Sequence, residues 1–220
     1  MARPDPILHR DDPGKAPLTG HVKVTREDWI NTAREVLIAS GAADVKILTL
    51  ANRLGVSRSS FYWYFGSRAD LLAALLDDWQ ARNTAPILRQ CALPAPSITA
   101  ALCNFFRCFV DDRLFDPHLD FAVREWSRRD STVRARIDAA DSARLNAVRA
   151  MYGAHGYPND EADIRARILY FMQIGYHALE LHEDIALRMS RLAGFLEHFT
   201  GQKASPEEIA DFTAHALAAP

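Results

Sequence analysis

Apolar residues recur along most of the chain with the period of an α-helix, and no segment shows the pattern of a β-hairpin. A first helix is expected after Thr25, which caps it with Asp28 as the partner in a capping box. Gly41 is expected to end this helix as a left-handed C′ residue. The helix presents one apolar stripe, made of Trp29, Ala33, Val36 and Leu37.

Three more helices are expected next. The second covers about 47–54, and its apolar positions recur at helical spacing: Ile47, Leu50, Ala51 and Leu54. The third covers about 58–65. A fourth begins at Ser67, where Asp70 completes another capping box, and Pro86 kinks or ends it.

The segment CALPAPS, residues 91–97, has the composition of a boundary between domains. Prolines 117, 158 and 206 fall near helix starts, where proline is tolerated. The expected helices beyond the boundary cover 97–113, 117–129, 131–154, 159–182, 184–199 and 205–218. The chain is therefore predicted to be all-α.

Composition describes an ordinary globular protein of one or two domains, with 220 residues, 49% hydrophobic and 25% charged. No apolar run reaches the ~18–20 residues of a membrane span, so no membrane association is expected. Residues 1–24 hold four prolines and no signal-peptide core, which predicts a flexible arm. The three cysteines are expected to be reduced cytoplasmic thiols, since neither a disulfide framework nor a zinc site fits their odd number and spacing.

Residues 45–69 carry a local positive charge on a chain whose net charge is −2. The segment has four basic residues and no acidic one, which indicates a nucleic-acid footprint: Lys46, Arg53, Arg58 and Arg68. Its centre reads as the turn of a helix-turn-helix. Gly55 tolerates positive φ, Val56 can enter the core, and Ser57 can cap the next helix through its hydroxyl.

On a helical wheel, the third helix turns its phenylalanines inward and an unusual polar-aromatic face outward. Ser59 and Trp63 point away from the core, Ser60 and Tyr62 flank them, and Arg58 and Tyr64 lie on the shoulders. Arginine can bind guanine O6 and N7, and hydroxyls can donate to phosphates. The alternative is that Trp63 and Tyr64 pack against the fourth helix as core.

Arg68 follows the cap Ser67, where the helix dipole disfavours a cation. A phosphate bound at those N–H groups would make the position favourable, and the alternative is a solvated arginine.

The stretch LANRLGVSRSSFYWYFGSRADLL resembles the N-terminal DNA-binding domain of the TetR family of transcriptional regulators, over residues 25–76. The resemblance implies base contacts from Arg58, Ser59 and Trp63. Phosphate contacts are expected from Lys46, Ser60, Tyr62, Tyr64 and Arg68. Three of these depart from the family's common residues: Tyr64 replaces histidine, Arg68 replaces lysine, and Lys46 replaces the threonine that often starts the second helix.

Residues 77–220 then correspond to the family's domain for effector binding and dimerisation. The candidates for an effector pocket are aromatic: Phe105, Phe106, Phe109, Trp126, Tyr152, Tyr170, Phe171, Tyr176 and His177. Plain core packing is the alternative for each of them. The 159–182 helix, with one of the last two helices, is expected to form a four-helix dimer interface; its candidate positions are Ile164, Ile168, Phe171, Met172 and Gly175.

The resulting hypothesis is a homodimeric regulator of operator DNA, a repressor modulated by an unknown small molecule, with no catalytic residues, cofactor or metal. An all-α enzyme or metal carrier is the alternative, based on His177, Glu180, His182 and Glu183 near one helix end. Its weakness is a reversed Glu-x-x-His order with no second copy. A non-specific architectural DNA binder is disfavoured by the overall negative charge.

Overall fold

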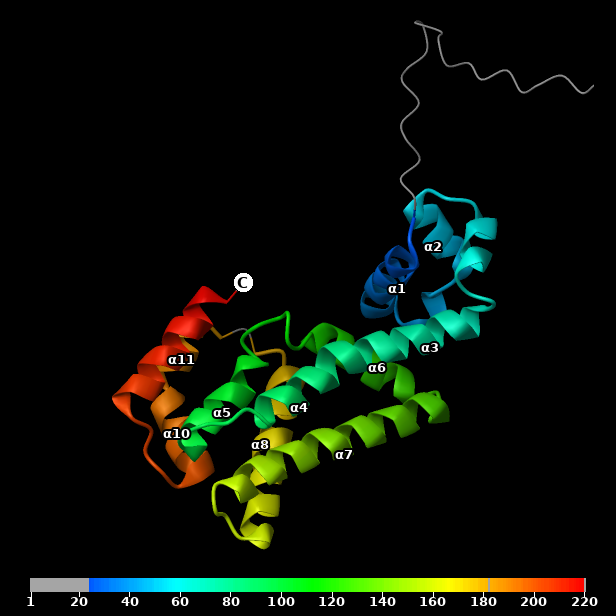
Figure 1. The fold of residues 1–220 in the computed structure, drawn as a ribbon. Helices are drawn as coiled ribbons and strands as arrows, with labels where there is room; N and C mark the ends of the chain where they lie inside the picture. Colours follow the sequence, from blue (N-terminus) through cyan, green and yellow to red (C-terminus); the bar gives the residue numbers. More distant parts are fainter. Residues whose placement is uncertain (1–23, 182, 220) are drawn as a thin grey trace, which may run out of the picture.

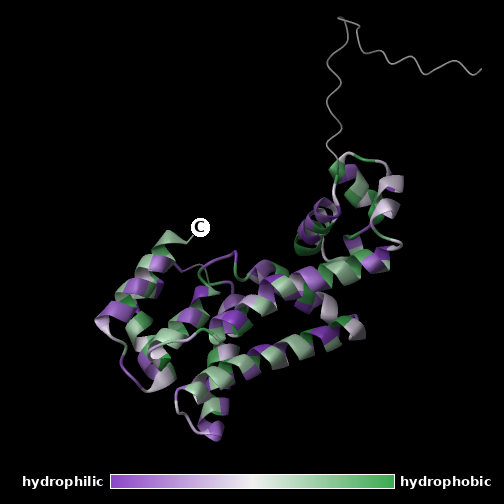
Figure 2. Cartoon of the chain, viewed as in Figure 1, coloured by the Kyte–Doolittle hydropathy of each residue, from purple (hydrophilic) through white to green (hydrophobic). Residues whose placement is uncertain are grey.

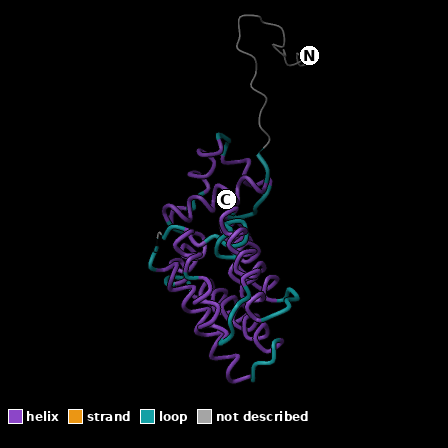
Figure 3. Tube along the Cα trace, turned by 90° about the vertical axis from the view of Figure 1, so that its left-hand side faces the viewer, coloured by secondary structure: helices purple, strands orange, loops and turns teal. Residues whose placement is uncertain are grey.

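The computed structural model describes residues 24–181 and 183–219, and every regular element within them is helical (Figures 1 and 3). The all-α prediction is confirmed. No helix among the described residues combines the length and apolarity that a membrane span requires. The predicted arm, except for Val24, lies outside the described residues.

The first elements form a compact head at one end of the molecule (Figure 1). They are α1 (Arg26–Ser40), η1 (Ala42–Asp44), α2 (Ile47–Leu54), η2 (Arg58–Trp63) and α3 (Arg68–Trp79). The capping box of α1 is present: Thr25 Oγ1 accepts from the Asp28 N–H at 3.2 Å, and the Asp28 carboxylate accepts from the Thr25 N–H at 2.7 Å. Gly41 has the expected positive φ of 79°, but its ψ of 169° lies outside the left-handed helical region.

Two predictions about α3 need correction. Ser67 Oγ accepts from the Asp70 N–H, yet the Asp70 carboxylate returns no bond, so the second capping box is wrong. The regular helix also ends earlier than Pro86, at Trp79, and gives way to the π-helical turn η3 (Gln80–Thr84). Proline offers no N–H to the carbonyl four residues back and clashes with it, so the turn before Pro86 widens.

After η3 the chain continues as α4 (Ala85–Cys91), so that α3 and α4 run as one rod from the head into the body (Figure 1). The body holds α5 (Ile98–Arg107), α6 (Pro117–Ser127), α7 (Ser131–Ala154), α8 (Asn159–Ala178), α9 (Ile185–Ser190), α10 (Leu192–Thr200) and α11 (Pro206–Ala218). The predicted bounds of α7 are confirmed to the residue, and those of α11 to within one.

Three predicted helices of the body are shorter or divided. The 97–113 helix ends at Arg107, because the N–H groups of residues 108–110 bond three residues back instead of four. The 159–182 helix ends at Ala178, and Glu180 beyond it has a positive φ of 49°. The 184–199 helix is split at Arg191 into α9 and α10.

The buried apolar residues form two hydrophobic cores. Along the helices, apolar and polar residues alternate in bands (Figure 2). The first core unites the head with Leu119 and Val123 of α6 and with Ile137 of α7. The second fills the body around residues such as Phe105 and Tyr152. Because α6 and α7 complete the core of the head, the division at residue 76 stays a prediction.

Candidate nucleic-acid interface

The turn before η2 is fixed by backbone geometry. Gly55 has φ 66° and ψ 28°, in the left-handed region, and the Val56 N–H donates to the Ala51 carbonyl at 3.0 Å. This ends α2 with the bond pattern of a glycine-terminated helix. Ser57 is extended, as a cap residue should be, but its hydroxyl bonds to Ser59 Oγ at 2.8 Å and caps no backbone N–H. The predicted side-chain cap is therefore wrong.

The element that follows is a 3₁₀ helix over Arg58–Trp63, where an α-helix over 58–65 was expected. The Tyr64 N–H donates to Phe61, three residues back, at 3.0 Å. Phe61 anchors the element: its buried ring meets Trp29 edge-on and stacks on Phe65, each with centroids 5.3 Å apart. With one anchor and about three residues per turn, the neighbouring side chains are directed outward.

All three predicted base-reading residues are exposed. Trp63 has 84% of its surface accessible, so the alternative that it packs as core is wrong. Arg58 makes no hydrogen bond or ion pair with another described residue, and its guanidinium is available for a base edge. Ser59 is held by its bond to Ser57. The outer face of η2 therefore presents an indole, a guanidinium and a hydroxyl together.

The predicted phosphate contacts divide into two groups, and Lys46, Ser60 and Tyr62 form the accessible one. Tyr62 is 51% exposed, with its ring edge against Phe61. Lys46 is exposed beside Asp44, at 2.8 Å between Nζ and Oδ1, and Ser60 Oγ donates to the Ser57 carbonyl at 2.8 Å. A surface ion pair such as that of Lys46 contributes little and is readily exchanged for a phosphate.

Tyr64 and Arg68 already have partners within the head. The Tyr64 hydroxyl donates to the Val24 carbonyl at 2.6 Å. Arg68 donates from Nε to the Val45 carbonyl and from Nη2 to the Ala42 carbonyl, both at 2.6 Å. Their phosphate contacts stay predictions, but both side chains first serve to hold the head together.

The structure does not bring the predicted effector residues together as one pocket. Phe105, Phe109, Tyr152 and Tyr170 are buried, whereas Phe171 is 56% exposed on α8. Trp126 packs against the first core, and His177 lies against the rings of Phe109 and Phe115. Phe106 and Tyr176 do line a cavity of the body, which we describe below. An effector role for the others stays a prediction.

The metal alternative receives no support from the described residues. They contain no group of three or more His, Cys, Asp or Glu side chains placed to hold a metal ion. His182, one of the four residues on which the alternative rested, lies outside them.

A buried ionic network between the head and the body was missed. Arg144 is fully buried; its Nη2 donates to Asp120 at 3.0 Å and its Nε to the Thr84 hydroxyl at 3.0 Å. Tyr170 adds a bond to Asp141 at 2.7 Å. A signal existed, because Arg144 falls within the apolar stripe of α7, four residues from Ala140 and Val148.

Comparison with known proteins shows what the head is similar to. Residues 30–75 match the family model described as bacterial regulatory proteins, tetR family. Over these residues the chain is similar to the DNA-binding domain of the tetR family. Over 54 residues, 24% of the chain, it is 37% identical to the uncharacterised HTH-type transcriptional regulator TtgW of Pseudomonas putida, of which the match spans 40%. It is also 36% identical over 52 residues to the HTH-type transcriptional regulator SrpR of Pseudomonas putida, covering 24% of each.

Several solved structures share the fold over most of the chain. A TetR-family regulator from Marinobacter aquaeolei has a TM-score of 0.61 at 14% identity, covering 90% of this chain and 100% of that one. AmtR of Mycobacterium smegmatis has 0.56 at 19%, covering 95% and 98%. The fatty acid degradation regulator FadR from Bacillus halodurans has 0.57 at 16%, covering 80% and 94%. At these identities the likeness shows the fold alone.

Proposed function

We propose that this protein is a cytoplasmic homodimer of the TetR family that represses transcription from an operator, acts without catalysis, and is released by a small molecule. The main support is the outer face of η2, where Arg58 and Trp63 are exposed on an element anchored by buried Phe61. The indole of Trp63 is outside the core of the head, and the guanidinium of Arg58 has no partner among the described residues. Together they suit the edges of bases in a major groove.

Dimerisation is supported by an apolar stripe on α8. Ile164, Ile168 and Phe171 are exposed at helical spacing, and Gly175 continues the stripe. A Cβ built on Gly175 meets nothing within 4 Å, so the helix surface is open to the close approach of a partner helix. Such a stripe is typical of a helix that pairs with a second copy across a two-fold axis.

Of the two helical candidates for the other half of the interface, we favour α10. It packs against α8, and its Phe195 is exposed. By contrast, α11 packs against α5 and α9 and turns Phe212 into the second core. A pair made of α8 and α10 from each subunit would hold the two heads at a fixed separation, as half-sites ~34–36 Å apart require.

The experiment combines molar mass with DNA binding. Light scattering should give twice the chain mass, and fluorescence anisotropy should show binding to DNA from upstream of the chain's own gene at low salt. Unlabelled random duplex should compete poorly. Equal competition by random duplex would make the protein a non-specific binder, and a monomeric mass would remove the interface. The role of an effector is tested in the same assay. A compound that lowers the affinity for the operator would support release by a ligand, and a compound that raises this affinity would contradict it.

A further inference from the structure

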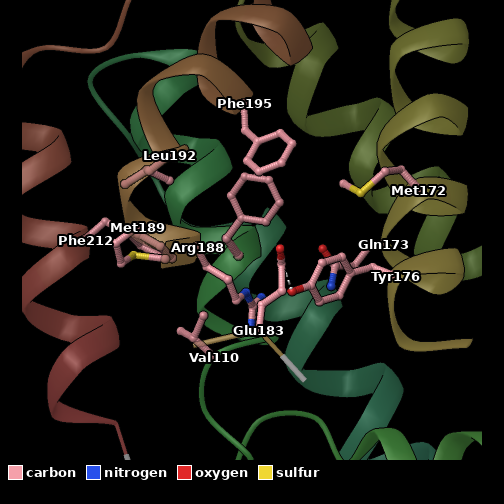
Figure 4. Close-up of a pocket in the computed structure, with 11 residues that line it drawn as sticks. Val110, Met172, Gln173, Tyr176, Glu183, Arg188, Met189, Leu192, Phe195 and Phe212 are labelled. Atoms are coloured by element: carbon pink, nitrogen blue, oxygen red, sulfur yellow. Dashed lines mark hydrogen bonds between the residues drawn. The ribbon is translucent and has the colours of Figure 1, made fainter. Parts of the chain in front are cut away.

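A cavity of about 60 Å³ lies in the body among α5, α8, α9, α10 and α11 (Figure 4). One side is apolar and comes from all five of these helices: Phe106, Met172, Met189, Leu192 and Phe212. The other side is polar, with Gln173 and Tyr176 of α8 facing Glu183 and Arg188 (Figure 4). An apolar chamber with a few polar groups at one end is the usual form of a small-molecule site.

The volume of the cavity limits the size of the apolar group that it can hold. A dry protein cavity of about 150 Å³ accommodates benzene, so 60 Å³ holds only a short apolar group without rearrangement. Met172 and Met189 are unbranched side chains that change conformation readily, and each can withdraw to enlarge the chamber. With this enlargement the cavity accommodates a ligand with a chain of a few carbons or a single ring.

The polar end carries a net positive charge. The Glu183 carboxylate accepts from the Tyr176 hydroxyl at 2.8 Å and from Arg191 Nη1 at 2.5 Å. Bonds from Arg191 and Tyr176 lower the pKa of Glu183, so the carboxylate is ionised and its charge is matched by Arg191. The positive charge of Arg188 is then not matched by a carboxylate of the cavity lining.

Arg188 has no anion of its own. Its guanidinium lies over the Tyr176 ring, 4.9 Å from the centroid, and no carboxylate of the described residues is within ion-pair distance. The Tyr176 ring restricts the guanidinium's movement, and the guanidinium N–H groups donate to no other described residue. An arginine held in this way at the end of an apolar cavity presents a fork that matches a carboxylate.

We infer that this cavity binds a small organic acid, with its carboxylate on Arg188 and its apolar body between Phe106 and Leu192. A cationic ligand is disfavoured, because the one carboxylate of the lining is already neutralised. The inference rests on the proposed function in taking this acid as the effector. The site lies on the helix proposed for dimerisation, since Met172 and Tyr176 of α8 line the cavity and Phe171 belongs to the exposed stripe.

The test is isothermal titration calorimetry with two acids and their uncharged and cationic analogues. Hexanoate is compared with hexan-1-ol and hexylamine, and 3-phenylpropanoate with its alcohol and amine. At least one acid should bind at least tenfold more tightly than its alcohol and amine. Arg188→Gln should weaken acid binding at least tenfold, and Arg188→Lys should retain part of it. The matched control Arg128→Gln, at an exposed site just after α6, should leave binding unchanged.

The outcomes separate the site from the proposed function. No binding by either acid, equal binding by acid and alcohol, or unchanged binding in a folded Arg188→Gln protein would each overturn the inference. Urea unfolding confirms that the variants are folded. Operator binding is measured separately by anisotropy. If an acid binds through Arg188 but leaves operator affinity unchanged, the site stands and its role as effector site fails.

Discussion

The indole N–H of Trp79, at the end of α3, donates to Oδ1 of Asp120 on α6 at 2.8 Å. The same oxygen accepts from Arg144 of α7 at 3.0 Å, so one carboxylate connects the helix that leaves the head with two helices of the body. Burial alone would raise the pKa of Asp120, but Arg144 and Arg124 outweigh it and hold the pKa below 3.8. The charged pair is therefore present at neutral pH.

Removing one partner of this ion pair should destabilise the protein more than removing both. Arg144→Met leaves Asp120 with less compensation in the interior and should lower the free energy of unfolding by about 3–5 kcal/mol. The double variant Arg144→Met/Asp120→Asn removes both charges and should be more stable than the single variant. Urea unfolding measures both. Additive losses would show that the two residues do not interact as a pair.

His177 should make stability depend on pH in a defined window. Burial lowers the pKa of His177 from 6.5 to about 4; Arg188 and His118 add to this, and Asp120 opposes it. Below about pH 6.5 the unfolded chain takes up a proton that the folded imidazole refuses until about pH 4, so stability is lost as the pH falls through this window. Above this window the contribution of His177 to stability no longer changes with pH.

Replacement of His177 by glutamine should therefore flatten the change in unfolding free energy between about pH 7 and about pH 5, measured by urea unfolding. His198→Gln, at an exposed position of α10, is the matched control and should keep the wild-type slope. A slope that is identical in all three proteins would assign the pH dependence to other groups.

Two aromatic residues of η2 should behave in opposite ways. Trp63→Ala should weaken operator binding and leave stability within about 0.5 kcal/mol, because the side chain is exposed. Phe61→Ala should cost about 3–5 kcal/mol of stability, because it leaves a cavity beside Trp29. Anisotropy and urea unfolding check the pair. A destabilised Trp63→Ala protein would mean that the indole supports the fold.

Arg58 and Arg68 should also differ. Arg58→Ala should relax base preference at one position per half-site, by about 1–3 kcal/mol, without loss of stability. Arg68→Ala should lower the unfolding free energy by about 1–3 kcal/mol, because two carbonyls lose a charged donor. Its phosphate role predicts a second effect, a weaker affinity for every DNA sequence with a flatter salt dependence. Unchanged stability would leave only the phosphate role for Arg68.

Phe171→Glu should convert the proposed dimer into monomers, since it places a charge within an apolar interface. Light scattering measures the mass at several concentrations. Leu217→Glu on α11 is the matched control, because Leu217 is equally exposed but lies on the helix we do not assign to the interface. Dissociation by Leu217→Glu instead would exchange the roles of α10 and α11.

The sequence predicted most helices because their apolar periods are strong, as in α7, whose two ends are marked by an aspartate cap and a glycine-containing turn. It missed the 3₁₀ form of η2, because the element has a single buried residue, Phe61, and so offers no apolar repeat that would distinguish a 3₁₀ from an α period. Exposure of Trp63 was still predicted, since Phe61 and Phe65 fix the inner side under either period. The division at Arg191 has no clear breaker residue.

The candidate sites depended on different kinds of information. The outward-facing residues of η2 were predictable because they are neighbours in sequence, within Arg58–Trp63. The cavity was not, because it needs Phe106 of α5 and Phe212 of α11 to meet Arg188. Phe105 and Phe106 are both aromatic, so residue type could not indicate that Phe105 packs in the core while Phe106 lines the cavity.

The π-helical turn Gln80–Thr84 gives the rod between head and body a particular sensitivity to chain length. The Ala85 N–H bonds to the carbonyl of Gln80, five residues back, so the turn accommodates one residue more than an α-helix would. Deleting one residue here would restore ordinary winding and leave the two halves of the rod in nearly the same relative orientation, whereas one further inserted residue would rotate one half against the other by about 100°. With such an insertion each subunit could still fold locally, yet the face of η2 that we propose to read DNA would be turned away from the duplex, so this turn should tolerate the loss of one residue but not the gain of another.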